Sequence, residues 1–117
     1  MTQNDLALFI RAMRRELRIK YCVRVNLFNG ECVPGGFDGW HRFNRRKHTI
    51  ALASSPSRAV LDVLAHELCH AAVTERHGFK AAWHGEQFQK ITREAIDAAA
   101  RLGYKVSSEI FLPELDT

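Results

Sequence analysis

Three side chains in one short stretch have the types and the spacing that metal-assisted hydrolysis requires. His66, Glu67 and His70 follow the order H-E-x-x-H within an apolar run, residues 64–72. On a helix, residues four apart lie on one face about 6 Å apart, so two imidazoles placed in this way can reach one metal ion. The intervening glutamate is then placed to accept the proton of a water that attacks a carbonyl.

The residues around this motif indicate a buried helix. Apolar side chains occupy most of the neighbouring positions: Val60, Leu61, Leu64, Ala65, Leu68, Ala71, Ala72 and Val73. Burying two imidazoles and a carboxylate among such residues costs free energy unless a partner offsets the cost. Histidines on a surface helix would simply be solvated, so the expected burial favours a metal site.

A third ligand is needed because catalytic zinc sites use three protein ligands and one water. His77 lies two turns beyond His70, about 10 Å along the helix axis, which is too far to share the ion. We expect it instead as a cation or donor at the helix C-terminus. At the start of the next helix His84 is favoured as the third ligand, with Glu86 and Glu94 as carboxylate alternatives.

Two further helices are predicted around the central one. The first spans residues 4–19, where apolar residues recur every three or four positions behind a polar cap at residue 4 or 5. The central helix is expected to begin within residues 54–57, where serine and proline are typical of a helix start, and to end at Gly78. The last helix follows His84 and ends at Gly103.

Three strands are expected between the first two helices. Apolar and polar residues alternate over residues 21–28 and 48–53, and a strand with less regular alternation is expected over residues 37–43. Short links between consecutive strands favour a small, mainly antiparallel sheet. The predicted fold class is therefore α+β, with a first helix, the sheet, the metal-binding helix and a ligand-bearing helix.

Composition limits the class of protein. A chain of 117 residues, 46% hydrophobic and 26% charged, is predicted to form a single soluble domain over residues 1–117. It contains no apolar run as long as a signal sequence or a membrane span. Its three cysteines, Cys22, Cys32 and Cys69, form no C-x-x-C pair, which predicts reduced thiols in the cytoplasm.

Basic residues gather in two stretches, and the formal net charge is +4. The stretches lie on the first helix and in the turn before the third strand: Arg11, Arg14, Arg15, Arg18, Arg45, Arg46 and Lys47. Basic stretches of this kind usually form a solvated surface. The more specific hypothesis is that these side chains contact the phosphates of a nucleic acid.

The two histidine motifs together resemble the signature of a known family. H-E-L-C-H at residues 66–70 and H-G-E-Q-F at residues 84–88 look like the paired motifs of the SprT-like zinc metallopeptidases, which include the Spartan DNA–protein crosslink proteases. Residues 49–52 are similar to the strand that precedes the metal helix in that family. The resemblance covers about residues 20–103 and leaves residues 104–117 as a tail. We expect this tail to lie against the domain through Val106, Ile110, Phe111 and Leu112.

This resemblance implies a minimal zincin-like fold and a zinc-dependent endopeptidase. The implied site holds one Zn²⁺ on His66, His70 and His84, with Glu67 as the catalytic base. An extended protein or peptide substrate is expected along an open edge of the sheet, and the resemblance suggests DNA-associated proteins as targets. The candidates for stabilising the oxyanion are His41, His48 and Tyr104.

Two other readings compete with a peptidase. The first is a non-catalytic zinc-containing module that binds nucleic acid, although structural zinc sites usually have four ligands and favour cysteine. Cys69 is a poor fourth ligand, because it is expected off the face that carries His66 and His70. The second, a metal-dependent ribonuclease with a compact three-histidine site, fits less well because the interval from His70 to His84 is longer than such sites use.

Overall fold

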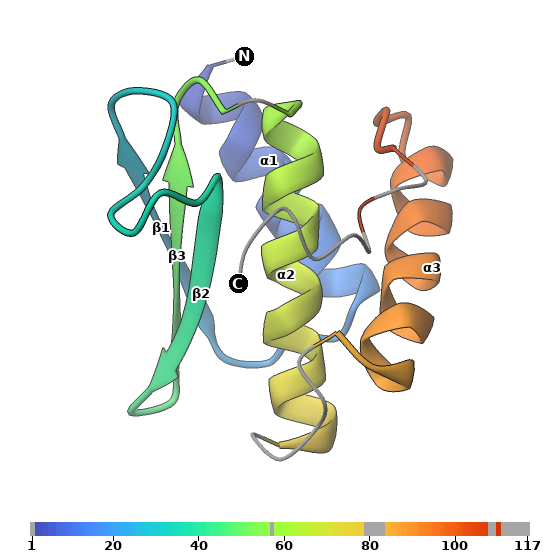
Figure 1. Cartoon of the computed structure of the whole chain (residues 1–117). Helices are drawn as coiled ribbons and strands as arrows, with labels where there is room; N and C mark the ends of the chain where they lie inside the picture. Colours follow the sequence, from blue (N-terminus) through green and yellow to red (C-terminus); the bar gives the residue numbers. More distant parts are fainter. Residues whose placement is uncertain (1, 57, 79–83, 108–109, 111–117) are drawn as a thin grey trace.

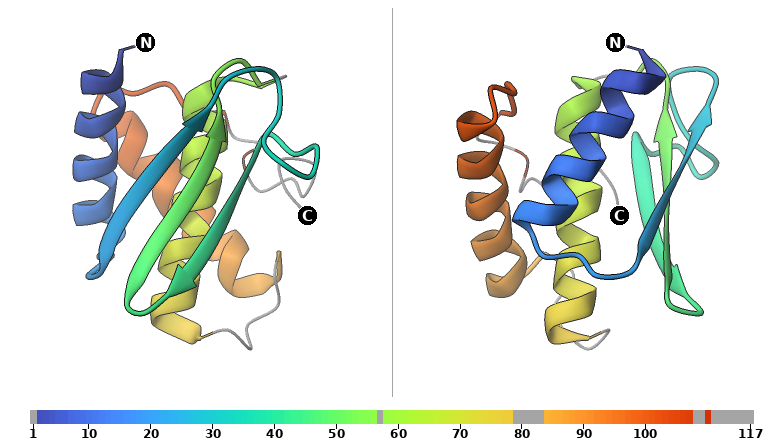
Figure 2. Two further views of the ribbon diagram at one scale, coloured as in Figure 1. Left: turned by 90° about the vertical axis from the view of Figure 1, so that its left-hand side faces the viewer. Right: turned by 180° about the vertical axis from the view of Figure 1, so that it is seen from behind.

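A computed structural model of the chain describes residues 2–56, 58–78, 84–107 and 110. Among these residues there are three helices and three strands, in the order α1 (Gln3–Glu16), β1 (Cys22–Phe28), β2 (Gly39–Asn44), β3 (Lys47–Ala53), α2 (Val60–His77) and α3 (Glu86–Arg101). In Figure 1, α2 lies between the sheet and α3, with α1 behind it. The views in Figure 2 show all three helices on one face of the sheet. The α+β class is confirmed.

The sheet is mixed, which corrects the expectation of a mainly antiparallel one. Its strand order is β1-β3-β2, and β3 pairs parallel with β1 and antiparallel with β2. The antiparallel pair closes through a two-residue turn at Arg45 and Arg46, whose φ values of 51° and 60° suit a primed hairpin turn. All of β2 and the loop of residues 29–38 lie between β1 and β3, so the chain has the length that a parallel connection needs.

The core lies between the sheet and the helices. On β3, Ile50 and Leu52 are fully buried in the main apolar cluster, which also contains Phe9 of α1 and Leu64 of α2. The intervening strand residues form a second, smaller cluster with residues of the loop between β1 and β2: Val33, Ala51 and Ala53, with Phe28, Phe37 and Trp40 packed against them. The central strand is therefore buried on both faces.

Helix α1 begins at Gln3, one residue earlier than predicted. Thr2, not residue 4 or 5, is the N-cap, and its side chain and that of Asp5 form a capping box. The helix ends at Glu16, three residues earlier than expected, and Arg18 beyond it has a φ of 57°. A positive φ is incompatible with continuing the helix.

The start of α2 lies several residues beyond the expected serines. Ala59 is its N-cap and makes no side-chain capping bond. Ser54 and Ser55 have another role: the Ser54 hydroxyl accepts a hydrogen bond from the Gly30 N–H at 3.0 Å, and the N–H groups of Ser54 and Ser55 donate to the carbonyl oxygens of Phe28 and Gly30. They therefore extend the pairing between the ends of β1 and β3. The other end of α2 agrees with the prediction, because the helix stops before Gly78, whose φ is 77°.

Two further features concern membrane spans and the cysteines. None of the helices formed by the described residues is long and apolar enough to cross a membrane. All three cysteines are free thiols, with Cys22 and Cys32 exposed and Cys69 buried.

Candidate metal centre

Helix α2 buries the H-E-x-x-H motif in the middle of the domain. His66 and Glu67 are fully buried and His70 is 2% exposed. The helix is in contact with the sheet on one side and with α3 on the other, so it is apolar around most of its circumference. Ionisable side chains in such surroundings need a partner of their own.

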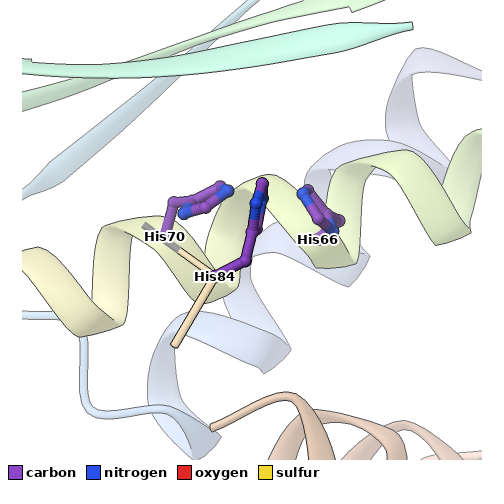
Figure 3. Close-up of side chains that lie close together, drawn as sticks. All are labelled: His66, His70 and His84. Atoms are coloured by element: carbon purple, nitrogen blue, oxygen red, sulfur yellow. The ribbon is translucent and has the colours of Figure 1, made fainter. Parts of the chain in front are cut away.

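The segment before α3 brings His84 to the same face of α2, as predicted. The ring centroids of His66 and His70 lie 4.9 Å apart, and that of His84 lies 5.3 Å and 5.0 Å from them. Figure 3 shows the three imidazoles close together along α2. One nitrogen of each ring lies within 4.8 Å of the others, so the cluster could hold a metal ion.

Phe88 packs against all three imidazoles. It is fully buried, and its ring centroid lies 4.4 Å from that of His70, 5.0 Å from that of His66 and 5.1 Å from that of His84. Gly85 is the N-cap of α3, so His84 stands just before the helix and Phe88 lies in its first turn. The H-G-x-x-F motif thus supplies both a histidine and the apolar surface that restrains the cluster.

A backbone group from the C-terminal segment orients His66. Its Nδ1–H donates a hydrogen bond to the carbonyl oxygen of Ile110. The residue Ile110 is 1% exposed. In the neutral ring the lone pair is then on Nε2, the form that a metal ligand requires. We had predicted that Ile110 lies against the domain, but a carbonyl acceptor has no sequence signature. Phe111 and Leu112, predicted to pack in the same way, lie outside the described residues.

Neither carboxylate alternative joins the cluster. The side chain of Glu86 is 80% exposed and lies 3.8 Å from the ammonium of Lys90. Glu94 forms an ion pair with Arg76 at 3.0 Å. Both glutamates are held at the surface of α3, away from the three imidazoles.

Two other candidates on α2 also lie outside the cluster. Cys69 is fully buried, and its pKa is raised, first by burial and then by the charge of Glu67. Its ligand atom is also not among those that converge with the three imidazoles. His77 is exposed in the last turn of the helix, where a cation was predicted.

Glycine at position 39 lets the edge of the sheet approach Glu67. A Cβ added there would lie 2.8 Å from the carbonyl oxygen of Ala51 and 2.9 Å from Cγ1 of Val63. It would also lie 3.6 Å from Cγ of Glu67. Strand β2 therefore passes directly over the acidic residue of the motif.

Two histidines of the sheet form a second buried group. Nε2 of His41 lies 2.8 Å from Nδ1 of His48, and Nε2 of His48 lies 2.6 Å from a carboxylate oxygen of Glu75. His41 is 6% exposed and His48 is fully buried. The ring of His41 lies nearly parallel to that of His70, with 6.4 Å between the centroids.

The pKa values of His48 and Glu75 are both lowered from their usual values. Burial is the largest influence on Glu75 and would raise its pKa, but hydrogen bonds from Lys20, His48 and Tyr21 together lower it. Burial also dominates at His48, where it lowers the pKa despite the opposing effect of Glu75. The favoured state is a neutral imidazole beside an ionised carboxylate.

The three residues predicted as oxyanion candidates have different surroundings. His41 lies beside His70, whereas His48 is engaged by Glu75, and Tyr104 packs edge-on against Phe9 at 4.9 Å. Sequence reasoning did not identify Glu75. The alternation of the third strand contained a signal, because His48 occupies the same face as two core residues.

Comparison with known proteins adds one finding. The model of the SprT-like family matches residues 9–108, which include both histidine motifs and all three strands. No curated protein matches the chain.

Proposed function

The chain belongs to the SprT-like family, and from this premise we propose that it is a zinc-dependent endopeptidase that hydrolyses peptide bonds of protein substrates. The observation that carries the proposal is the convergence of three imidazoles, His66, His70 and His84, within 4.8 Å. Imidazole nitrogen is a preferred ligand of zinc, and three protein ligands leave a position for water or substrate. The donor set therefore fits a catalytic zinc site better than a closed structural one.

Glu67 is the catalytic base in this proposal. A bound zinc ion would polarise the scissile carbonyl and lower the pKa of its water ligand to about 7. A carboxylate oxygen of Glu67 would accept the proton of the attacking water and pass it to the leaving amine. The burial of Glu67 and its place next to His66 on α2 support this role.

The outer edge of β2 is our candidate for the substrate-binding strand. β2 stands at the end of the strand order and pairs with β3 alone among the described strands. An extended peptide can add to such an edge through main-chain hydrogen bonds. Because Gly39 at the start of β2 lies against Glu67, a peptide bound there would pass close to the base.

Replacing the base tests this proposal. We expect Glu67→Gln to keep about one zinc per chain and to lose about 10²- to 10⁴-fold of peptide hydrolysis, the range that general acid–base catalysis contributes. Metal analysis and cleavage of a denatured protein substrate measure the two properties. Glu86→Gln is the matched control, since that glutamate is exposed. Wild-type cleavage by the Glu67→Gln protein would contradict the assignment.

We further propose that nucleic acid is a partner, so that the substrates are DNA-associated proteins. Six cations of the two basic stretches are exposed: Arg11, Arg15, Arg18, Arg45, Arg46 and Lys47. The seventh, Arg14, has a structural role, since its guanidinium donates to the carbonyl oxygens of Lys20 and Tyr21. The exposed groups are therefore available to phosphates.

Salt dependence tests this partner separately from catalysis. With the Glu67→Gln protein, DNA affinity should fall as salt rises, and the double variant Arg45→Ala/Arg46→Ala should reduce the slope by about two. No DNA binding at low salt would exclude the partner. DNA binding by a wild-type protein that holds zinc and cleaves no substrate would instead favour a non-catalytic module.

A further inference from the structure

We propose that His41 is a positioning residue of this site, and that it forms with His48 and Glu75 a buried brace that fixes the edge strand β2 against the metal helix α2. The inference rests on the proposed endopeptidase function, which it deepens. We call His41, His48 and Glu75 the brace. None of them belongs to the three-histidine cluster.

The brace joins three elements that are distant in sequence. His41 is on β2, His48 on β3 and Glu75 near the end of α2. The two contacts, 2.8 Å between the histidines and 2.6 Å from His48 to Glu75, have the lengths of good hydrogen bonds. They run from the edge strand through the central strand to the helix.

The far end of the brace is fixed by the backbone. The two carboxylate oxygens of Glu75 accept hydrogen bonds from the N–H groups of Lys20 at 2.7 Å and Tyr21 at 3.1 Å. Hydrogen bonds to an ionised carboxylate are stronger than those between neutral groups. Glu75 is therefore held in one orientation by the connection between α1 and β1.

The ionised carboxylate of Glu75 determines which atom donates in each hydrogen bond of the brace. An ionised carboxylate only accepts, so Nε2 of His48 carries the proton that it donates to Glu75. In the neutral ring Nδ1 is then an acceptor, and it receives the Nε2–H of His41. Since His48 is fully buried and His41 almost so, breaking either contact would leave a buried polar group unsatisfied.

The near end of the brace lies at the proposed site. Gly39 and His41 are alternate residues of β2 and face α2 together. The first lies against Glu67, and the second has its ring 6.4 Å from that of His70. Releasing His41 would therefore let the substrate edge move relative to the base.

The expected signature of such a brace is a change in turnover without a change in metal binding. Misplacing reacting groups by about 1 Å can cost about 10² in rate. The three histidines of the cluster come from α2 and the segment before α3, so their metal affinity does not depend on the position of β2. Peptide pairing along β2 uses main-chain groups, so KM should also change little.

A matched pair of variants at His48 tests the proposal. Leucine at this position keeps an apolar side chain of similar volume and removes both hydrogen bonds, whereas the amide of glutamine offers one acceptor and one donor. In zinc-loaded protein we expect kcat to fall about 10- to 100-fold in His48→Leu and to stay within about threefold in His48→Gln. KM and the zinc dissociation constant should stay within about threefold in both.

Two outcomes would overturn the brace. One is an unchanged kcat in a folded His48→Leu protein, and the other is a loss of zinc affinity that parallels the loss of kcat, since the network would then act on the metal ligands. If His48→Leu does not fold, His41→Leu and His41→Gln form the equivalent pair.

A measurement without turnover separates this proposal from the proposed function. In cobalt-loaded protein, pseudocontact shifts report where the backbone amides of β2 lie relative to the metal. These shifts should change in His48→Leu and stay close to wild type in His48→Gln. Unchanged shifts in His48→Leu would overturn the brace, whereas inactive wild-type protein with the expected shifts would overturn the endopeptidase function alone.

Discussion

Two groups of histidines, most of them buried, lie side by side in this domain and use their ring nitrogens in opposite ways. In the first group, His66, His70 and His84, one nitrogen of each ring approaches a common point. In the second, His41 and His48 are bonded head to tail and end on the carboxylate of Glu75. Burial is common to both, so burial alone does not make a metal site. The partner differs: a carboxylate closes the second group, and the geometry of the first suits a cation.

Helix α2 contributes to both groups, which explains how they can coexist. Its middle carries His66 and His70, and its last turns carry Glu75. The carboxylate is thus about one and a half turns beyond His70, where it meets the sheet instead of the three-histidine cluster. Substitutions that affect one group and leave the other intact therefore test whether the two groups have different roles.

The largest effect is expected where one converging nitrogen is removed. We expect His84→Ala to weaken zinc binding by more than the roughly 100-fold that loss of an outer partner of a ligand costs. Competition with a chromophoric chelator measures this affinity. His77→Ala is the control, because His77 is exposed at the end of α2. Wild-type zinc affinity in His84→Ala would show that His84 is not a zinc ligand. The first group would then no longer differ from the second as a metal site.

A smaller effect is expected where β2 approaches α2, at Gly39. Gly39→Ala should lower the free energy of unfolding by about 1–3 kcal/mol, since overpacking of a close contact costs that much. The added Cβ would lie 2.9 Å from Cγ1 of Val63 and 2.8 Å from a carbonyl oxygen. Denaturant unfolding measures the change.

A double variant identifies the cause of that loss. Because Val63 supplies one of the two close atoms, Gly39→Ala/Val63→Ala should be more stable than the sum of the single changes predicts, by about 0.5 kcal/mol or more. Strict additivity would show that the cost does not come from this contact. It would also weaken the argument that β2 is pressed against α2.

The smallest effect is a pH dependence that belongs to the second group. The pKa of His48 is lowered from its usual 6.5 and that of Glu75 from its usual 4.5, so both bind fewer protons in the folded state than in the unfolded state. The contribution of His48 to stability is therefore complete above about pH 6.5 and is lost as the pH falls toward its folded pKa. Glu75 behaves in the same way below its usual value.

Comparing variants isolates this contribution. In the presence of a chelator, the free energy of unfolding of the wild-type protein should fall between pH 7.5 and pH 5.5, and the fall should be shallower in His48→Leu. The chelator removes the contribution of metal release in acid. An equal or steeper fall in the variant would mean that His48 is not the buried neutral group responsible.

The first group was predictable from sequence because its geometry is local. His66 and His70 stand four apart in an apolar run, whereas His84 was favoured from its motif, H-G-x-x-F, ahead of the next helix. The 3.6-residue period converts such spacing directly into a shared face. The α+β class was also predictable, because the alternation of apolar and polar residues in strands and the periodicity of helices each appear within a few consecutive residues.

The second group depends on strand order, which local patterns do not specify. The side chains of a strand alternate in the same way whether it pairs parallel or antiparallel, so β3 was not expected between β1 and β2. Glu75 reaches His48 only because that order brings the end of α2 to the central strand. The capping of α1 by Thr2 and the later start of α2 were missed because serine, threonine and aspartate are equally good in turns and in caps.

X-ray absorption of the zinc-loaded protein would identify the metal ligands themselves. We expect one zinc per chain with three imidazole nitrogens and one oxygen at about 2.0–2.1 Å and no sulfur. A sulfur at about 2.3 Å would assign Cys69 to the site, and a fourth imidazole would turn the catalytic centre into a closed structural one. Either result would contradict the open three-histidine site on which the endopeptidase function rests.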